Sequence, residues 1–451
     1  MRRHRGRPLG SLGRLAALLG VVFLAPLARA NGAFPDEFSI HFPQSAPHRI
    51  MVGANFGLLV SEDDGATWRY TCEPWITDGS SAALTSDNVD FYQLTADGAM
   101  LAQSVTVTRS DDDACTWPVS GGSIGGQTVA DLFPDPGNSS LVIAIVSIAN
   151  GGYLVASHDG GKTFDSPHLY DTSGLLTGIE ISRTRPAVIY ATLVTASGTG
   201  GATLLRSDDL GTTWEPHSIP TPSGTEPLIM AIDPADPDIV YLRVVGALTD
   251  SVVITVDGGK SFQTPLSING QFSSFVRAGD GALYLGTLAG MLYVRAPGTT
   301  SFTSHAAPHF RCLGQRPGTS RLFACGDMNL DGFSVGYSDD GGDTFTPMMS
   351  FTQLLGPLNC APVQANCQAH WARIQGVLGI VASDGGADGG PPDAGAPDAG
   401  APDGGGPPPS PNTGQKSGCS TTGVDTASIA AVIALLLFWR RHSRACNRVS
   451  N

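Results

Sequence analysis

Aspartates are the residues of this chain whose number and placement most suggest chemistry. The sequence holds 40 acidic against 26 basic residues. Many aspartates occupy predicted loops, and those outside any recurring motif include Asp78, Asp87, Asp90, Asp131 and Asp250. Two carboxyl groups that flank a glycosidic bond are enough for acid–base hydrolysis of a glycan. Because nothing in their spacing singles out a pair, the sequence identifies no catalytic residue, and glycoside hydrolysis stays an open alternative.

Two shorter motifs have residue types suited to catalysis or metal binding. Residues 121–125 fit the Gly-x-Ser-x-Gly pattern of a serine nucleophile, which needs a strand before it and a helix after it. A glycine-rich loop is predicted there instead. Asp327, Asn329 and Asp331 match the first half of a calcium loop. Ser338 stands where the last ligand, a glutamate, belongs, so a plain turn is predicted with calcium as the alternative; no metal and no cofactor are predicted.

An octapeptide of the form Ser-x-Asp-x-Gly-x-Thr-aromatic recurs along the chain. Its third positions fall at 63, 112, 159, 209, 257, 297 and 340, so successive copies are 40 to 50 residues apart. The sixth copy, from Arg295, retains only Gly298, Ser301 and Phe302 and has Pro297 in the third position. A turn followed by a strand-like run precedes the copies with the same period, which indicates a structural repeat. The third-position aspartates of the other copies are Asp63, Asp112, Asp159, Asp209, Asp257 and Asp340.

The octapeptide is predicted to form a tight turn between two strands. Its aspartate can accept hydrogen bonds from amides of its own turn, and its glycine can adopt a positive φ. The terminal Trp or Phe is expected to pack between neighbouring sheets. Repeats of this length, with about four short strands each, have the size of one propeller blade. The sequence therefore predicts an all-β fold, a seven-bladed β-propeller over residues 31–381, with structural rather than catalytic octapeptide aspartates.

This octapeptide resembles the Asp box, or BNR repeat, of propellers in sialidases, xyloglucan-degrading glycoside hydrolases, sortilin-type receptors and a photosystem assembly factor. The resemblance implies that the boxes lie at the blade periphery, away from a central site. A sialidase would also show a Phe/Tyr-Arg-Ile-Pro motif before the first box, which residues 42–50 do not match. A sialidase would also need three arginines that bind the carboxylate of the sugar. Here Arg69, Arg109 and Arg206 flank boxes, where a role in a strand or at the rim is expected. Sialidase activity is therefore not predicted.

The cysteines predict disulfides. An even number in an exported chain is typical of them, and six cysteines allow fifteen pairings. Proximity in sequence suggests that Cys312 pairs with Cys325 and Cys360 with Cys367, which leaves Cys72 for Cys115. Zinc is the alternative, but no Cys-x-x-Cys or His-x-x-x-His spacing supports it.

The first 30 residues have the pattern of a secretory signal peptide. A basic stretch is followed by an apolar run over residues 15–24 and by Ala28-Arg29-Ala30, the small-residue pattern of a cleavage site. Without these residues and the four arginines that follow Trp439, the exported body has 16 basic against 40 acidic residues, a net charge of about −24 that repels phosphate backbones. Nucleic acid is therefore excluded as a partner.

The C-terminal end predicts a membrane-anchored tail. Residues 382–416 are mostly Gly, Pro, Ala and Asp and are predicted to be a disordered spacer. Residues 417–451 contain Cys419, a short apolar helix over 427–439 and a cluster of arginines. Together they resemble the MYXO-CTERM sorting tail of myxobacterial surface proteins, which implies processing near Cys419 by a sorting protease. Cys446 departs from that pattern, and a simple membrane anchor is the alternative.

A complete scaffold without a recognisable catalytic set favours a binding function. The prediction is a binding or adhesion propeller, displayed at the cell surface or outer membrane or released outside the cell, that recognises a glycan or a protein. The alternatives are a glycoside hydrolase or lyase with its carboxylates in loops between blades, and a structural component of the cell surface.

Overall fold

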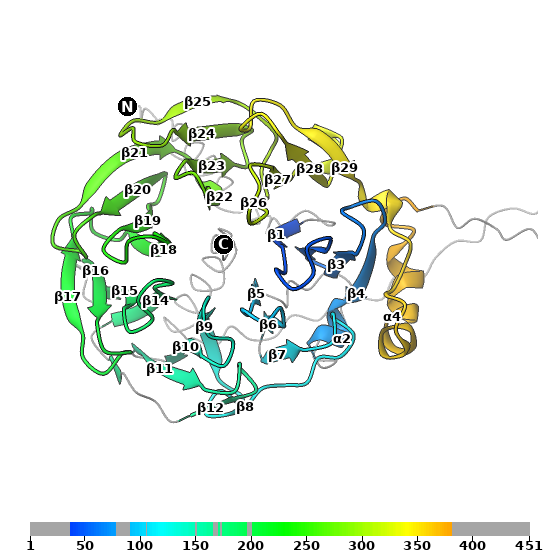
Figure 1. The fold of residues 1–451 in the computed structure, drawn as a ribbon, viewed down its shortest axis with the longest axis horizontal. Helices are drawn as coiled ribbons and strands as arrows, with labels where there is room; N and C mark the ends of the chain where they lie inside the picture. The colour runs from blue at the N-terminus through cyan, green and yellow to red at the C-terminus, as the bar shows by residue number, and fades with distance from the viewer. Residues whose placement is uncertain are drawn as a thin grey trace, which may run out of the picture.

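Short segments rich in Val, Ile, Leu and Tyr form antiparallel strands, as the repeated turns predict. The computed structural model describes residues 37–77, 91–104, 106–148, 151–165, 170–171, 174–195 and 201–380. In this part of the chain, seven small sheets surround one axis as the blades of a β-propeller (Figure 1), which confirms the predicted fold. The predicted signal peptide, spacer and tail, with Cys419 and residues 427–439, lie outside the described residues. None of the described helices is long and apolar enough to cross a membrane.

Each blade takes its strands from the ring axis outwards, in chain order. Blades 1 to 3 are formed by β1 (Glu37–His41), β2 (Ile50–Ala54), β3 (Gly57–Ser61) and β4 (Arg69–Cys72); by β5 (Phe91–Leu94), β6 (Met100–Gln103) and β7 (Val107–Ser110); and by β9 (Thr128–Pro134), β10 (Val142–Ile148), β11 (Gly151–Ser157) and β13 (Tyr170–Asp171). A short parallel pair, β8 (Gly121–Gly122) with β12 (Thr163–Phe164), joins blade 2 to blade 3.

The remaining blades have four strands each. They are β14 (Gly174–Ile181), β15 (Ile189–Thr195), β16 (Ala202–Ser207) and β17 (Glu215–Ile219); β18 (Glu226–Ile232), β19 (Val240–Val245), β20 (Thr249–Thr255) and β21 (Gln263–Asn269); β22 (Phe272–Arg277), β23 (Leu283–Thr287), β24 (Met291–Arg295) and β25 (Thr303–Ala306); and β26 (Cys312–Gln315), β27 (Leu322–Cys325), β28 (Val335–Ser338) and β29 (Thr346–Met349). The described helices are α2 (Glu73–Ile76), α3 (Met328–Asp331), the 3-10 turn η1 (Phe351–Gln353) and α4 (Ala361–Ile374).

The octapeptides all follow the third strand of a blade. In blade 4, Asp209 Oδ1 accepts hydrogen bonds from the Ser207 hydroxyl at 2.8 Å and from the Thr213 amide at 2.8 Å. Its Oδ2 accepts the Thr213 hydroxyl at 2.7 Å, while Ser207 Oγ accepts the Gly211 amide at 2.8 Å. The turns with Asp63, Asp112, Asp159, Asp257 and Asp340 repeat these contacts. The sixth copy keeps the turn through the amide of Thr299, which donates to the Ala296 carbonyl at 3.2 Å.

Replacing Ser207 with alanine is expected to destabilise the protein by about 1–3 kcal/mol, because the buried Gly211 amide would lose its acceptor. Ser207→Thr is the matched control, since Thr255 makes the same two contacts in blade 5 and the hydroxyl is retained. Urea unfolding of both variants gives the comparison. Equal losses in the two variants would contradict a role for the hydroxyl.

The octapeptide turns of blades 1, 2 and 3 also join each of these blades to the one before it in the ring. In three turns, an arginine of the preceding blade donates a hydrogen bond to the fourth residue of the octapeptide. The pairs are Arg316 with the carboxylate of Asp64, Arg49 with that of Asp113, and Arg109 with the carbonyl of Gly160. At the fifth position, Gly161 has φ +91°, and a Cβ there would lie 2.9 Å from Leu101 of blade 2. Glycine is therefore required at this position both by the backbone conformation and by the close approach of the neighbouring blade.

The seam between blade 7 and blade 1 is closed from outside the ring. Within the described residues, blade 1 and blade 7 each take all their strands from one continuous stretch, so no strand is exchanged across the seam. Instead, residues 354–358 run along β4 and form three backbone hydrogen bonds with Trp68 and Tyr70, at 2.9 to 3.1 Å. Helix α4 follows and lies against the outside of blade 1 (Figure 1). We call residues 354–374 the clasp.

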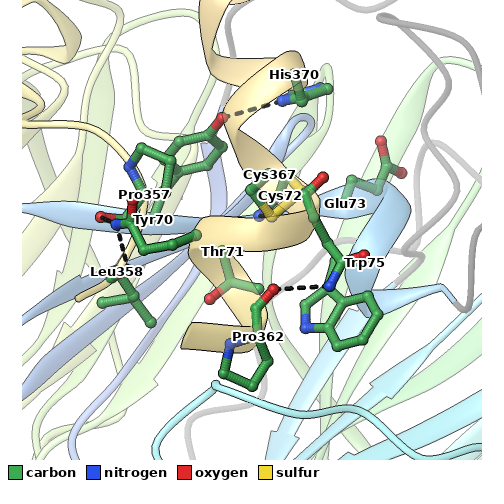
Figure 2. Close-up of a disulfide and its surroundings, with 12 residues drawn as sticks. Tyr70, Thr71, Cys72, Glu73, Trp75, Pro357, Leu358, Pro362, Cys367 and His370 are labelled. Atoms are coloured by element: carbon green, nitrogen blue, oxygen red, sulfur yellow. Dashed lines mark hydrogen bonds between the residues drawn. A yellow bond between two sulfur atoms is a disulfide. The ribbon is translucent and has the colours of Figure 1, made fainter. Parts of the chain in front are cut away.

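Disulfides fix the clasp to blades 1 and 2. Cys367 on α4 is bonded to Cys72 at the end of β4 (Figure 2), and Cys360, which begins the helix, is bonded to Cys115 in the octapeptide of blade 2. The predicted pairings of Cys360 with Cys367 and of Cys72 with Cys115 are therefore wrong. Seven residues of α-helix span about 10 Å, too far for one disulfide. The predicted Cys312–Cys325 bond is confirmed, as a directly opposed pair of β26 and β27.

Candidate functional site

Two octapeptide aspartates, Asp257 and Asp340, are held as ionised acceptors within their turns. The hydroxyl of Ser261 lowers the pKa of Asp257 to about 2, and the hydroxyl of Thr344 does the same for Asp340. A carboxyl group with such a pKa holds no proton near neutral pH. These two groups are thus poorly suited to act as general acids.

Two of the five aspartates considered for hydrolysis lie within the described residues, and both connect neighbouring blades. Asp131 of β9 accepts the amide of Ile179 in blade 4 at 2.8 Å. Asp250 of β20 is fully buried, pairs with Arg243 at 2.6 Å and accepts the amide of Phe272 in blade 6 at 2.9 Å. The other three, Asp78, Asp87 and Asp90, lie outside the described residues. Both Asp131 and Asp250 therefore serve the packing of the blades.

The two shorter motifs have structural contacts. Residues 121–125 form a turn between blades 2 and 3 that is followed by strand β9 and not by a helix, so the geometry of a serine nucleophile is missing. Asp327 caps α3 by accepting the amides of Asn329 and Leu330 at 2.9 and 3.2 Å. Asp331 accepts a hydrogen bond from ring nitrogen Nδ1 of His309 at 2.9 Å. Among the described residues, no three His, Cys, Asp or Glu side chains are grouped as a metal site.

One pocket is built by the innermost strands of four consecutive blades. We call it the axial pocket, because these strands are the ones closest to the ring axis (Figure 1). It lies at the C-terminal ends of the strands. Its lining comprises Phe133 and Pro136 of blade 3, Glu180, Ile181 and Arg183 of blade 4, Met230, Ala231, Ile232 and Pro234 of blade 5, and Phe275, Val276 and Arg277 of blade 6.

Bulges in the inner strands help to shape this pocket. Thr177 in β14 and Ser273 in β22 are extra residues four positions before the last paired residue of their strands, and Met230 in β18 is an extra residue two positions before it. A bulge bends a strand and turns the following side chains to new directions. Beyond the bulge of β14, Glu180 reaches blade 5, where its Oε1 accepts the amide of Ile232 at 2.9 Å. The blades are thus linked beside the pocket.

The pocket combines apolar and cationic side chains. Phe133, Met230 and Phe275 are buried. Arg277 donates from Nε to Asp233 at 3.0 Å, which fixes its guanidinium, while Arg183 is exposed on the following turn of blade 4. Glu180 is the single carboxylate among the lining residues and binds a backbone amide. The arrangement offers an apolar surface with two guanidinium groups, and no pair of carboxylates for hydrolysis lines it.

The pocket opens on the face that carries the octapeptides. In an antiparallel blade, the connection between the first two strands and the one between the last two lie at the same end. Hydrogen bonds agree with this, because the octapeptide amides of Gly160 and Leu210 donate to carbonyls in the first connections of their blades. No feature of the sequence singled out the pocket residues, although they lie within or directly before the turns that repeat with the octapeptides. That repeat was the available signal.

Comparisons with known proteins support no family assignment. No family model and no curated protein matches the chain. Solved structures with which it shares 11–13% identity include the extracellular domain of a one-component system from B. thetaiotaomicron, with a TM-score of 0.49 over 69% of this chain and 42% of that chain. A GH74 xyloglucanase from Xanthomonas campestris has a TM-score of 0.37 over 71% and 80% of the two chains, and the Dos1 propeller 0.47 over 72% and 85%. At such identities the likeness concerns the fold and not the activity.

Proposed function

We propose that this protein is an extracellular binding or adhesion propeller whose axial pocket takes part of a glycan or a protein. The observation that carries this proposal is the pocket itself, in which four blades present buried apolar side chains beside Arg183 and Arg277. Binding sites combine an apolar lining with a few polar groups in this way. In a chain of net charge −14, two arginines at one pocket favour a ligand with an anionic group.

The lining favours binding over hydrolysis. A glycoside hydrolase needs two carboxyl groups on opposite sides of the bond that breaks. Glu180 is the one carboxylate of the lining, and its Oε1 already accepts the Ile232 amide. Hydrolysis at this pocket would therefore need a second acid from elsewhere.

The place of action is proposed from the sequence. We infer that residues 1–30 direct export and that the tail over residues 417–451 anchors the propeller at the cell surface. The spacer over residues 382–416 would hold the ring away from the membrane. Three disulfides within the described residues support an oxidising environment outside the cytoplasm.

The test is an array of glycans and peptides incubated with the purified protein, scored for retained protein and for altered glycans. Retention without cleavage is the expected result. Cleavage of any glycan would instead favour the hydrolase. No retention on either array would favour a structural surface component.

Arg183→Ala is expected to weaken retention of a ligand roughly tenfold or more, because one charge-assisted hydrogen bond contributes about 1.5–3 kcal/mol. Arg185→Ala is the matched control. It removes the same charge from the same turn, but Arg185 pairs with Asp208 at 3.4 Å and does not line the pocket. Titration of both variants against the retained ligand gives the comparison, and equal weakening would indicate general charge attraction and contradict the proposed site.

A further inference from the structure

The two clasp disulfides differ in their accessibility. Cys115 and Cys360 are half-buried at the N-terminal end of α4. Cys72 and Cys367 are fully buried between β4 and the middle of the helix (Figure 2). A reagent in solution can therefore reach the first disulfide while the clasp is in place, and can reach the second only after the clasp moves.

Apart from the disulfides, α4 contacts the ring along one face, where the rings of His370 and Trp371 lie beside Tyr70. Of its 14 residues, four are buried, namely Val363, Cys367, His370 and Ile374. His370 is within hydrogen-bonding distance of the Tyr70 hydroxyl, at 3.1 Å (Figure 2). A helix with so narrow a buried face gains little from packing, so local opening is expected once a covalent link is removed.

We propose that the Cys115–Cys360 disulfide is a thiol-exchange site that controls release of the clasp from the propeller. A thiolate from solution attacks this disulfide first. Its cleavage frees the start of α4 from blade 2, and the helix can then swing away from β4. That movement exposes Cys72–Cys367 to a second exchange, after which the seam between blades 7 and 1 has lost its covalent closure.

The chemistry consumes one dithiol equivalent for each disulfide. A thiolate forms a mixed disulfide with one cysteine sulfur and displaces the other cysteine as a thiolate. A second thiolate from the reductant then attacks the mixed disulfide and releases the remaining cysteine. The reductant leaves as its own disulfide, and the two cysteine thiolates take up protons from water. The reaction partner is therefore a small thiol or the dithiol of a redox protein, and reversal of the same steps closes the clasp.

The third disulfide should not take part. Cys312 and Cys325 are fully buried and directly opposed on β26 and β27, inside blade 7. Their exposure would require the blade itself to open. This bond therefore provides an internal reference for global unfolding in the same molecule.

The experiment incubates the oxidised full-length protein with dithiothreitol under native conditions, quenches it by alkylation and follows each cysteine by peptide mass spectrometry. Labelling of Cys115 and Cys360 is expected first, with a rate proportional to the thiol concentration. Cys72 and Cys367 are expected to follow, and Cys312 and Cys325 last. Simultaneous labelling of all six at one rate would mean global unfolding and would overturn the proposal.

A double variant, Cys115→Ser with Cys360→Ser, tests the control of the second disulfide by the first. Reduction of Cys72–Cys367 is expected to be at least about tenfold faster in this variant, because local opening of α4 no longer waits for the first exchange. An unchanged rate would overturn the proposal.

Hydrogen exchange at the amides of Tyr70 and Leu358 gives a second readout, which uses wild-type protein in which only the first disulfide has been reduced. These two amides donate backbone hydrogen bonds between β4 and the clasp. They are expected to lose protection from exchange once the first disulfide has been reduced. Retained protection would show that the clasp stays docked, and this measurement still decides the question if the double variant does not fold.

Discussion

Replacing Asp250 with alanine is expected to lower the free energy of unfolding by about 3–5 kcal/mol, because the buried guanidinium of Arg243 would lose this carboxylate. The side chains of Arg243 and Asp250 are 1% and 0% exposed, so water cannot solvate the guanidinium in place of the lost carboxylate. The amide of Phe272, the first residue of blade 6, would lose its acceptor as well. The loss is measured by urea unfolding.

Two controls separate the charge from the junction between blades. Asp250→Asn keeps an acceptor for Phe272 but removes the charge, and an intermediate loss is expected. Asp339→Ala breaks the exposed pair with Arg321 and should cost no more than about 1 kcal/mol. A loss below about 1 kcal/mol for Asp250→Ala would show that Arg243 is adequately solvated without its partner.

Acidification is expected to destabilise the protein by about 3 kcal/mol for each of two buried histidines. Burial lowers the pKa of His41 and of His370 to about 4, from an ordinary value of 6.5. The unfolded chain therefore binds these protons more readily than the folded one. Stability is full above pH 6.5 and falls as the pH decreases toward 4. Unfolding free energies measured between pH 7 and pH 4 test this.

The octapeptide aspartates contribute in a separate pH range. The pKa values of Asp257 and Asp340 are about 2 in the folded protein, below the ordinary value of 3.8, so their contribution is present above pH 3.8 and is lost toward pH 2. His370→Gln should reduce the pH dependence above pH 4 and leave the lower range unchanged. Asp340→Asn should do the opposite, and overlapping effects of the two variants would contradict this assignment.

The blades could be predicted from the sequence because their contacts are local. The octapeptide bonds join residues at most four positions apart, such as Ser207 with Gly211 and Asp209 with Thr213. The turn before each second strand is equally local, so each blade leaves a complete signature within 40 to 50 residues. Even the altered sixth copy, with Pro297, keeps its turn between β24 and β25.

The clasp and the pocket could not be predicted in the same way. Cys72 and Cys367 are 295 positions apart and become neighbours only after seven blades have curved into a ring. Sequence proximity therefore selected the wrong partner for Cys367. Likewise, Arg183 and Arg277 lie on different blades, and only the curvature of the ring brings their strands to one pocket. These features depend on the closed geometry and not on any single repeat.

The way each blade is assembled has a consequence for how such a chain can change. Apart from the β8–β12 pair, every described blade draws its strands from one uninterrupted stretch. A whole blade is therefore a unit that a gene can duplicate, delete or exchange without cutting a sheet in two. A circularly permuted gene that began at another blade would encode the same ring. The cysteines of the clasp would still have to meet their partners.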